Sequence, residues 1–332
     1  MSQIIASKDL IIACLEYMGE GSTLLDYELL GGGISGAGTY RLRLSTGHAV
    51  LKVTSADSED YRLERSRREM AFFLTLAPQL PLRVPEVLGG CESPDLGICL
   101  LLAAYTPMRA ADWNRADYLA VAEELAQLHA VYWGQSHRLD AYDWLRRPDV
   151  RALSRDIDHA REAWRALHEI PRFGPVLSGP TLDRIIGLLE RERAIEDALA
   201  TLPLTLCHGD CHADNLLRAS DGGLVWADWQ EVGIGPGSGD LSFFFQRATF
   251  GRAPLPTEIM IETYRRTLEN ATGEKLPSDA IQRVLAADEL RTRLLAWPDY
   301  LARASEEQMA GMIGRIRELA VRLGLSDAMP RG

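Results

Sequence analysis

The spacing of hydrophobic and polar residues changes once along the chain. Up to about residue 105, apolar and polar positions largely alternate, which is typical of strands with one buried face, and turn residues separate the runs. The strands predicted from this pattern cover residues 26–30, 39–44, 48–53, 86–91 and 97–103. One helical segment, 59–76, stands among them and ends before Pro81. The first part of the chain is therefore predicted to be a small β-rich lobe.

Beyond Trp113, apolar residues recur at helical spacing. The helices predicted there cover residues 117–132, 151–167, 182–199, 257–270, 278–304 and 306–323. Thr257 and Ser278 are the predicted N-cap residues of the helices that they begin. The pattern as a whole predicts an α+β protein with two domains, residues 1–105 and residues 106–332.

Two short apolar runs near the middle of the chain each stop at an acidic residue. The first ends at Asp210, and the second, 224–227, ends at Asp228. Asn215 lies five residues after Asp210, and a predicted hairpin turn at 220–223 separates the two runs. Polar residues at strand ends usually lie in loops on a rigid scaffold, where chemistry is concentrated.

These three residues suggest phosphoryl transfer, in which positioning and charge neutralisation supply most of the catalysis. Asp210 would act as general base or position an incoming hydroxyl. The oxygens of Asn215 and Asp228 are the hard ligands that Mg²⁺ prefers. A metal-dependent phosphoesterase would need more histidines in matched motifs, and the chain's other five are scattered: His48, His129, His137, His159 and His168. An ordinary structural turn is the third interpretation.

Lysine is rare in this sequence, which makes Lys52 a candidate ligand. Of 36 basic residues, only Lys8, Lys52 and Lys275 are lysines, and Lys52 is the one inside a predicted strand. A compact ammonium suits phosphate, so we predict that Lys52 binds the α- and β-phosphates.

A glycine-rich segment, 31–38, precedes this lysine. It is predicted to turn between two strands and to bind phosphate through backbone N–H groups at Gly33 and Gly36, with Ser35 as a further contact. The same glycines would fit a dinucleotide-binding fingerprint, which requires a helix directly afterwards. Residues 39–44 alternate as a strand, and this favours the hairpin.

The combined motifs resemble a known family. The run His208-Gly209-Asp210-x-His212-x-x-Asn215, with Asp228 thirteen residues later, resembles the aminoglycoside phosphotransferases and choline kinases, which are small-molecule kinases of protein-kinase-like fold. Protein kinases have Arg where this chain has Gly209, and Phe-Gly where it has Trp229-Gln230.

This resemblance implies a two-lobed kinase-like fold, ATP or GTP with Mg²⁺, and a small-molecule hydroxyl as phosphate acceptor. The acceptor would be an antibiotic such as an aminoglycoside. The alternative is a metabolic kinase for choline, an amino alcohol, a sugar or another small alcohol. A nucleotide-binding module without transfer activity is the third hypothesis.

The resemblance also implies roles for single residues. Glu69 would orient Lys52, with Glu64 as the competing candidate, and residues 101–105 would form the hinge where the backbone at Ala104 meets the base. His212 would either contact phosphate or hold Asp228. Asp240 would be a structural residue that opens the next helix. The region expected to supply the acceptor pocket contains Asp288, Glu289, Trp297, Asp299 and Tyr300.

Composition adds four expectations. The net charge of −11 argues against a nucleic-acid partner, which would require a basic surface. The longest apolar run, 98–105, is far shorter than the ~20 residues that cross a bilayer. The first residues lack a basic leader, so we expect a cytoplasmic enzyme, as a monomer or homodimer. The five cysteines are expected to be reduced core residues: Cys14, Cys91, Cys99, Cys207 and Cys211.

Overall fold

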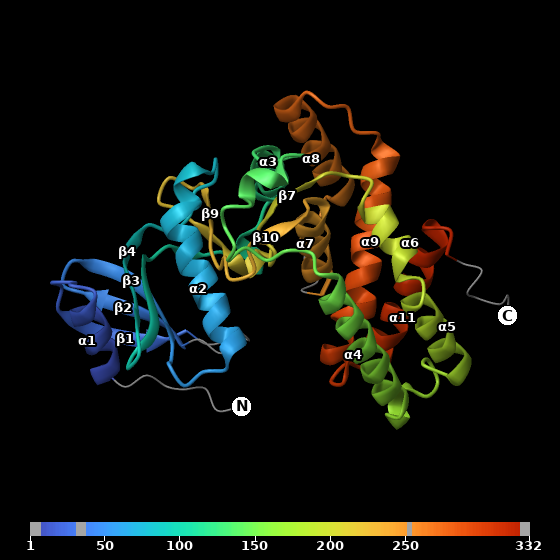
Figure 1. The fold of residues 1–332 in the computed structure, drawn as a ribbon, viewed down its shortest axis with the longest axis horizontal. Helices are drawn as coiled ribbons and strands as arrows, with labels where there is room; N and C mark the ends of the chain where they lie inside the picture. The colour runs from blue at the N-terminus through green and yellow to red at the C-terminus, as the bar shows by residue number, and fades with distance from the viewer. Residues whose placement is uncertain (1–7, 31–37, 251–253, 326–332) are drawn as a thin grey trace. The chain divides into compact units, whose positions relative to one another are not determined.

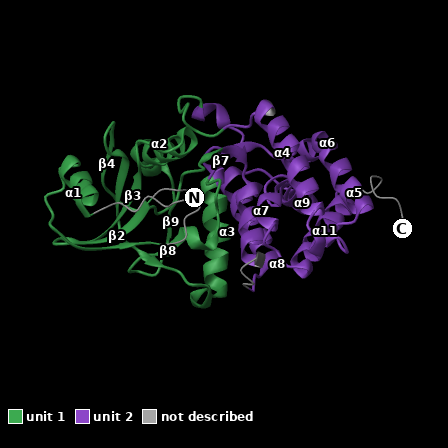
Figure 2. Cartoon of the chain, turned by 90° about the horizontal axis from the view of Figure 1, so that it is seen from below, with its two compact units in different colours: residues 1–128, 140–146, 208–233 green, residues 129–139, 147–207, 234–332 purple. Residues whose placement is uncertain are grey.

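The computed structural model describes residues 8–30, 38–250 and 254–325, which form two compact units (Figures 1 and 2). Unit 1 contains the described residues of 1–128, 140–146 and 208–233. Unit 2 contains those of 129–139, 147–207 and 234–332. The segment 208–233, which carries both acidic motifs, thus belongs to the same unit as the N-terminal strands. The predicted domains 1–105 and 106–332 stay a prediction.

Unit 1 is built on a five-stranded antiparallel sheet, as the alternating pattern predicts. In spatial order its strands are β1 (Leu24–Leu29), β2 (Gly38–Leu44), β3 (Gly47–Thr54), β5 (Gly97–Ala103) and β4 (Val87–Ser93). Each lies within a few residues of its predicted range. Edge strand β1 is largely exposed, whereas β5 is buried along nearly its whole length. The inner strands therefore hold the core of this unit.

Two helices cover opposite faces of this sheet (Figure 1). Helix α1 (Lys8–Tyr17) packs Ile11 and Leu15 into one apolar core with Leu51 of β3. Successive strand residues point to opposite faces, so Lys52 points away from α1. Helix α2 (Asp60–Thr75) lies on that second face, where its Glu69 contacts Lys52. The core face and the polar face of β3 are thus separated by strand geometry alone.

The rest of unit 1 carries the second acidic motif. Strands β6 (Thr106–Pro107), β8 (Leu216–Arg218) and β9 (Leu224–Trp226) form a three-stranded antiparallel sheet. The turn between β8 and β9 is closed by the Ala219 N–H, which donates to the Gly223 carbonyl at 2.9 Å, and this confirms the predicted hairpin. Trp226 Nε1 donates to Glu124 of α3 (Arg115–Ala130) at 2.5 Å, which fixes the end of β9.

Unit 2 is mainly helical. Its central helix, α9 (Ser278–Leu295), contacts α4, α6, α7, α10 and α11 and buries an apolar face among them. The other helices are α4 (Val150–His168), α5 (Gly179–Leu189), α6 (Glu192–Leu199), α7 (Ser238–Phe250), α8 (Thr257–Thr272), α10 (Pro298–Leu301) and α11 (Glu306–Arg322). Strands β7 (Leu204–Cys207) and β10 (Gly233–Pro236) pair with each other. Short 3-10 turns of the chain are Ala77–Gln79, Ala110–Asp112, Ser136–Leu139, Pro171–Phe173 and Ala213–Asn215.

Two helix predictions are wrong in detail. The segment 182–199 forms two helices, because the chain changes direction at Glu190 and each helix then buries its own apolar face. The segment 278–304 is also interrupted: α9 ends at Leu295, and Pro298 begins α10. Proline cannot donate the backbone hydrogen bond that continuing α9 would need, but it fits the first turn of a new helix.

Two predicted N-caps are shifted by one residue. Thr257 and Ser278 are the first helical residues of α8 and α9, and the cap positions are occupied by Pro256 and Pro277. Proline at a cap fixes φ near the value that the adjoining helix requires. The prolines, rather than the hydroxyl side chains, therefore mark where both helices begin.

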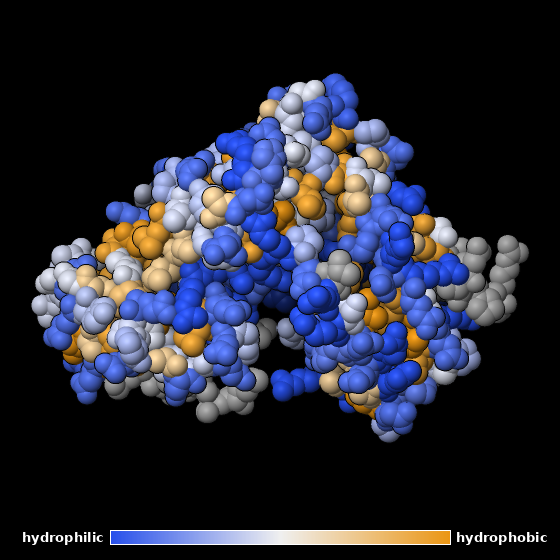
Figure 3. Space-filling model, viewed as in Figure 1, coloured by the Kyte–Doolittle hydropathy of each residue, from blue (hydrophilic) through white to orange (hydrophobic). Residues whose placement is uncertain are grey.

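The described surface is mainly hydrophilic, with apolar side chains in small groups (Figure 3). In the described part of the chain, every helix is too short or too polar to cross a membrane.

Asp288 is an acidic side chain buried in the core of unit 2. It lies on α9 and accepts a 2.7 Å hydrogen bond from the Ser238 hydroxyl, and Arg291 lies 3.5 Å away. Burial disfavours the charged form and raises the pKa of Asp288 to about 6, although Arg291 and Ser238 oppose the shift. The neutral acid is therefore favoured in the folded state over a wider pH range than in the unfolded chain.

This raised pKa predicts that Asp288 makes unit 2 less stable as pH rises. Between about pH 4 and about pH 6 the unfolded chain loses the proton first, so the free energy of unfolding falls by up to about 3 kcal/mol across this window. Asp288→Asn cannot titrate. The stability difference between wild type and this variant, measured by urea unfolding at several pH values, should change across the window; a constant difference would contradict the assignment.

Candidate active site

Lys52 lies between two carboxylates in unit 1. Its Nζ donates to both carboxylate oxygens of Glu69 at 2.7 Å and to Asp228 Oδ1 at 2.8 Å. Strand β3 supplies the lysine, α2 supplies Glu69, and the turn after β9 supplies Asp228. The structure therefore brings these three predicted residues together from 17 and 176 residues apart in sequence.

The three charges determine each other's ionisation. Burial on its own would lower the pKa of Lys52, but Asp228 and Glu69 outweigh it, so this pKa is raised. Burial raises the pKa of Glu69 in spite of Lys52. Burial acts in the same direction on Asp228, yet the attraction of Lys52 prevails and the pKa of Asp228 is lowered. Lys52 is thus held as a cation and Asp228 as an anion, and the Asp228 side chain is 32% exposed to solvent.

The loop that follows β7 is held by the ring of His208. The His208 Nε2–H donates to the Ala227 carbonyl at 3.0 Å, and Nδ1 accepts from the Asp210 N–H at 3.2 Å. These two bonds require the neutral tautomer with its proton on Nε2. His208 therefore joins the loop bearing Asp210 to the residue before Asp228, which agrees with the bracing role expected of it.

Asn215 closes the same loop from its other end. Its side-chain amide donates to the backbone oxygen of Asp210 at 2.9 Å and more weakly to Asp210 Oδ2 at 3.3 Å. The Ala227 N–H donates to the Asn215 carbonyl at 2.9 Å. Since the amide nitrogen faces Asp210, the side-chain oxygen Oδ1 is left as the acceptor atom. His212 lies beside this loop, 3.8 Å from Asp210 Oδ2 and 3.6 Å from Asp214 Oδ2.

The backbone around the two acids adopts left-handed conformations. Gly209 has φ +84°, and a Cβ there would lie 2.1 Å from the Glu231 carbonyl oxygen. Asp228 has φ 62°, and among the residues described it is the one non-glycine with positive φ. Asp tolerates this region better than most residues, because its short side chain can hydrogen-bond locally. Both acids are thus presented by tight turns.

An aromatic stack supports the site from below. The Trp229 ring lies 4.0 Å from Phe72 of α2 at an interplanar angle of 13°, and 4.4 Å from the His208 ring. The Trp229 N–H donates to Glu69 Oε1 at 3.2 Å, and Arg68 Nη1 donates to the Gln230 carbonyl at 2.7 Å. These contacts fix α2 to the turn after Asp228. Sequence reasoning missed the stack, although the pair Phe72 and Phe73 on a helix with charged neighbours was a visible signal.

The other predicted nucleotide contacts stay predictions. Gly33, Ser35 and Gly36 lie outside the described residues. Strand β2 follows this segment and pairs with β1, so the helix required by a dinucleotide fingerprint is absent at residues 38–44. At the expected hinge, the Ala104 N–H donates to the His48 carbonyl at 3.3 Å. A base would therefore have to use the carbonyl of Ala104 or a neighbouring backbone group.

Most residues of the expected acceptor region make contacts within unit 2. Glu289 accepts from Arg293 and Arg315, and Trp297 is buried and donates to Gln246 at 2.9 Å. Asp299 pairs with His159 at 2.9 Å, a partner that the sequence did not indicate. Tyr300 is exposed and lies edge-on to Trp297. In this set, Asp299 and Tyr300 are the side chains that reach solvent.

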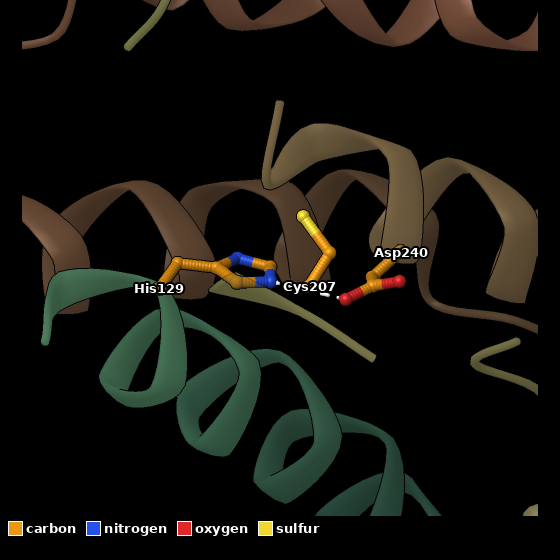
Figure 4. A group of neighbouring side chains, drawn as sticks. All are labelled: His129, Cys207 and Asp240. Atoms are coloured by element: carbon orange, nitrogen blue, oxygen red, sulfur yellow. Dashed lines mark hydrogen bonds and ion pairs between the residues drawn. The ribbon is translucent and has the colours of Figure 1, made fainter. Parts of the chain in front are cut away.

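Unit 2 also contains a buried group of metal-ligating residue types, His129, Cys207 and Asp240 (Figure 4). Protein partners hold the imidazole: Nε2 lies 3.2 Å from Asp240 Oδ2, and Nδ1 lies 2.8 Å from the Tyr264 hydroxyl. Asp240 lies in the first turn of α7, as expected of a residue that opens this helix. The arrangement is that of a hydrogen-bonded core network.

Comparison with known proteins places this geometry in context. Residues 26–274 match the model of a family described as "Phosphotransferase enzyme family". No curated protein matches the sequence.

Solved structures share the fold at low sequence identity. A choline kinase from Cryptosporidium parvum Iowa II is similar with TM-score 0.65 and 12% identity, covering 98% of each chain. An aminoglycoside phosphotransferase from Alicyclobacillus acidocaldarius gives TM-score 0.61 and 15% identity, covering 98% of this chain and 96% of the other. The GDP complex of aminoglycoside 2'-phosphotransferase-IIIa gives 0.60 and 13%, covering 95% and 99%. At these identities the likeness shows the fold, and it confirms the predicted two-lobed kinase-like class.

The backbone clash at Gly209 predicts a large loss of stability for Gly209→Ala. The new Cβ would meet the Glu231 carbonyl in a conformation that alanine disfavours, so we expect a loss of about 2–4 kcal/mol in the free energy of unfolding. Gly222→Ala is the matched control, because φ there is +87° but no atom lies within 4 Å. It should cost about 1 kcal/mol. Equal losses for both variants in denaturant unfolding would contradict the role given to the clash.

Proposed function

Because the chain belongs to the phosphotransferase enzyme family, we propose that it transfers the terminal phosphate of ATP or GTP to a hydroxyl group of a small molecule. The observation that carries the proposal is the cation of Lys52 held between Glu69 and Asp228, on the same unit as the loop of Asp210 and Asn215. This combination supplies a phosphate ligand, a carboxylate for the acceptor and oxygen ligands for a metal. Its geometry comes from one sheet, one helix and two adjoining turns.

Lys52 is the proposed ligand of the nucleotide phosphates. Its ammonium is kept protonated by two carboxylates, and Glu69 holds it with both oxygens at 2.7 Å. Glu69 is itself fixed by the Trp229 N–H, so the lysine has little freedom to turn. A preformed cation neutralises charge on phosphate without paying for reorganisation during the reaction. This supports Glu69 over Glu64 as the orienting residue.

Asn215 and Asp228 would hold Mg²⁺. The fit rests on their donor atoms: the Asn215 amide nitrogen is engaged by Asp210, which leaves its oxygen, and Asp228 is a partly exposed anion. One amide oxygen and one carboxylate, completed by phosphate and water, are a set that Mg²⁺ accepts. When bound, the ion would supply charge neutralisation on the phosphates.

Asp210 would receive the acceptor hydroxyl. Its carboxylate is 28% exposed and its backbone is held by His208 on one side and Asn215 on the other. A hydroxyl that donates its hydrogen bond to this carboxylate is oriented with its oxygen free to attack. The proton then has an acceptor within hydrogen-bond distance as the new bond forms.

We propose an antibiotic such as an aminoglycoside as the acceptor. The net charge of −11 favours the approach of a polycation. The alternative acceptors are choline, an amino alcohol, a sugar or another small alcohol. A panel with members of both classes separates these possibilities by measured phosphate transfer.

The metal assignment predicts stabilisation by nucleotide that depends on Asp228. At a nucleotide concentration ~100 times Kd, wild type should gain about 2.7 kcal/mol with Mg²⁺ and ATP or GTP together. Asp228→Asn should lose most of this gain, because it removes the anionic ligand while Asn still tolerates positive φ. The measurement is a thermal shift with and without each component.

Asp221→Asn is the control for that experiment. Asp221 is an exposed acid in the turn between β8 and β9, where it pairs with Arg83 at 2.7 Å. Its replacement should leave the nucleotide shift unchanged. A full shift in Asp228→Asn, or none in wild type with either nucleotide, would overturn the metal assignment.

The role of Asp210 predicts a large loss of turnover for Asp210→Asn. Removing the carboxylate that receives the hydroxyl proton should lower kcat by about 10²–10⁴, with the nucleotide-dependent thermal shift retained. Asp214→Asn is the matched control in the same loop, because Asp214 is 81% exposed. Phosphate transfer to the best acceptor of the panel is the readout. Near-normal kcat in Asp210→Asn would refute this role.

A further inference from the structure

Three of the five cysteines gather in the apolar core of unit 1. Cys14 lies on α1, Cys91 on β4 and Cys99 on β5, and all three belong to or pack against one hydrophobic cluster. The sulfur atoms of Cys14 and Cys99 are 3.0 Å apart. Cys91 is the cross-strand partner of Cys99, so their side chains share one face of the sheet. The chain thus places three thiols in one small volume from segments far apart in sequence.

We propose that Cys14 and Cys99 are an oxidisable thiol pair that a peroxide converts to a disulfide, tying α1 to the central sheet. The sulfurs of a disulfide lie about 2 Å apart, so the pair needs to close by only about 1 Å. Helix α1 contacts the sheet through apolar side chains of the same cluster. It can therefore make this small approach without breaking a strand hydrogen bond.

The reaction balances with hydrogen peroxide as the two-electron oxidant. The Cys14 sulfur attacks one peroxide oxygen, the O–O bond breaks, and Cys14 becomes a sulfenic acid while one water is released. The Cys99 thiol then attacks the Cys14 sulfur, the S–S bond forms, and the hydroxyl of the sulfenic acid leaves with the Cys99 proton as a second water. Two thiols are oxidised to one disulfide, and one peroxide is reduced to two waters.

The surroundings favour Cys14 as the attacking sulfur. A hydrogen bond from Cys99 lowers the pKa of the Cys14 thiol, whereas that bond and burial raise the pKa of Cys99. The thiolate is the nucleophile in such chemistry. Cys91 is the least buried of the three and lies on the edge strand β4, which gives a small peroxide access to the cluster from that side.

The bond would constrain the strand beside Lys52. Cys99 pairs with Val53, the residue after Lys52, and the new link would close a stretch of 85 residues that includes β1, β2, β3 and α2. A link across so long a stretch restricts the unfolded chain and should stabilise unit 1. This inference is independent of the proposed function, because its readouts are thiol content and unfolding.

The test uses the full-length reduced protein treated with a small excess of hydrogen peroxide and then alkylated under denaturing conditions. We expect two of the five thiols to escape alkylation, a peptide pair that links Cys14 to Cys99, and a rise of several degrees in the melting temperature. Dithiothreitol should reverse all three changes. Unfolded protein treated in the same way confirms that the oxidant is active.

Two variants make the assignment specific. Cys91→Ser keeps the proposed pair and should still form the bond and show the rise in melting temperature. Cys14→Ala fills a buried helical position with another small apolar residue, and peroxide should leave its melting temperature unchanged. Five alkylated thiols in oxidised wild type, a disulfide that involves Cys91, or the same rise in Cys14→Ala would each overturn the proposal.

Discussion

The site depends on keeping one buried cation paired. An ammonium taken out of water is costly unless opposite charges and hydrogen bonds replace its hydration. Lys52 meets this requirement with two carboxylates, one from α2 and one from the turn after β9. Each carboxylate is in turn secured by its own element, so the strand, the helix and the turn hold one another in register. With two acids around one base, the cluster keeps a residual negative charge beside the partly exposed Asp228, where a divalent cation would be electrostatically favoured.

Backbone geometry delivers the remaining groups. His208 uses both ring nitrogens to connect the loop of Asp210 with Ala227, and Asn215 uses its amide to hold Asp210 from the other end. The stack of Trp229 on Phe72 extends this connection to α2. Side chains that would never touch substrate thus set the distance between the acids and the lysine. Polar groups placed in this way need no large rearrangement before charge develops on a reacting phosphate.

Local patterns predicted the elements better than their ends. The alternation of β2 and β3 and the hairpin turn at 220–223 were readable, because each depends on near neighbours in sequence. The break before Pro298 was also written in the sequence, but apolar spacing on both sides concealed it. Lys52, Glu69 and Asp228 were predicted as a group, and the structure brings them together. The stack and the Asp299 pairing with His159 were missed, since they depend on packing between segments distant in sequence.

The conformation of Asp228 limits which residues could ever replace it. Its φ of 62° selects for Gly, Asn and Asp, whose side chains tolerate that region, while its contact with Lys52 selects for an anion. Glutamate satisfies the second demand and fails the first, and asparagine satisfies the first and fails the second. Only aspartate satisfies both, so this position has no conservative neighbour in the genetic code. Loss of function there would be hard to repair by any single change except reversion.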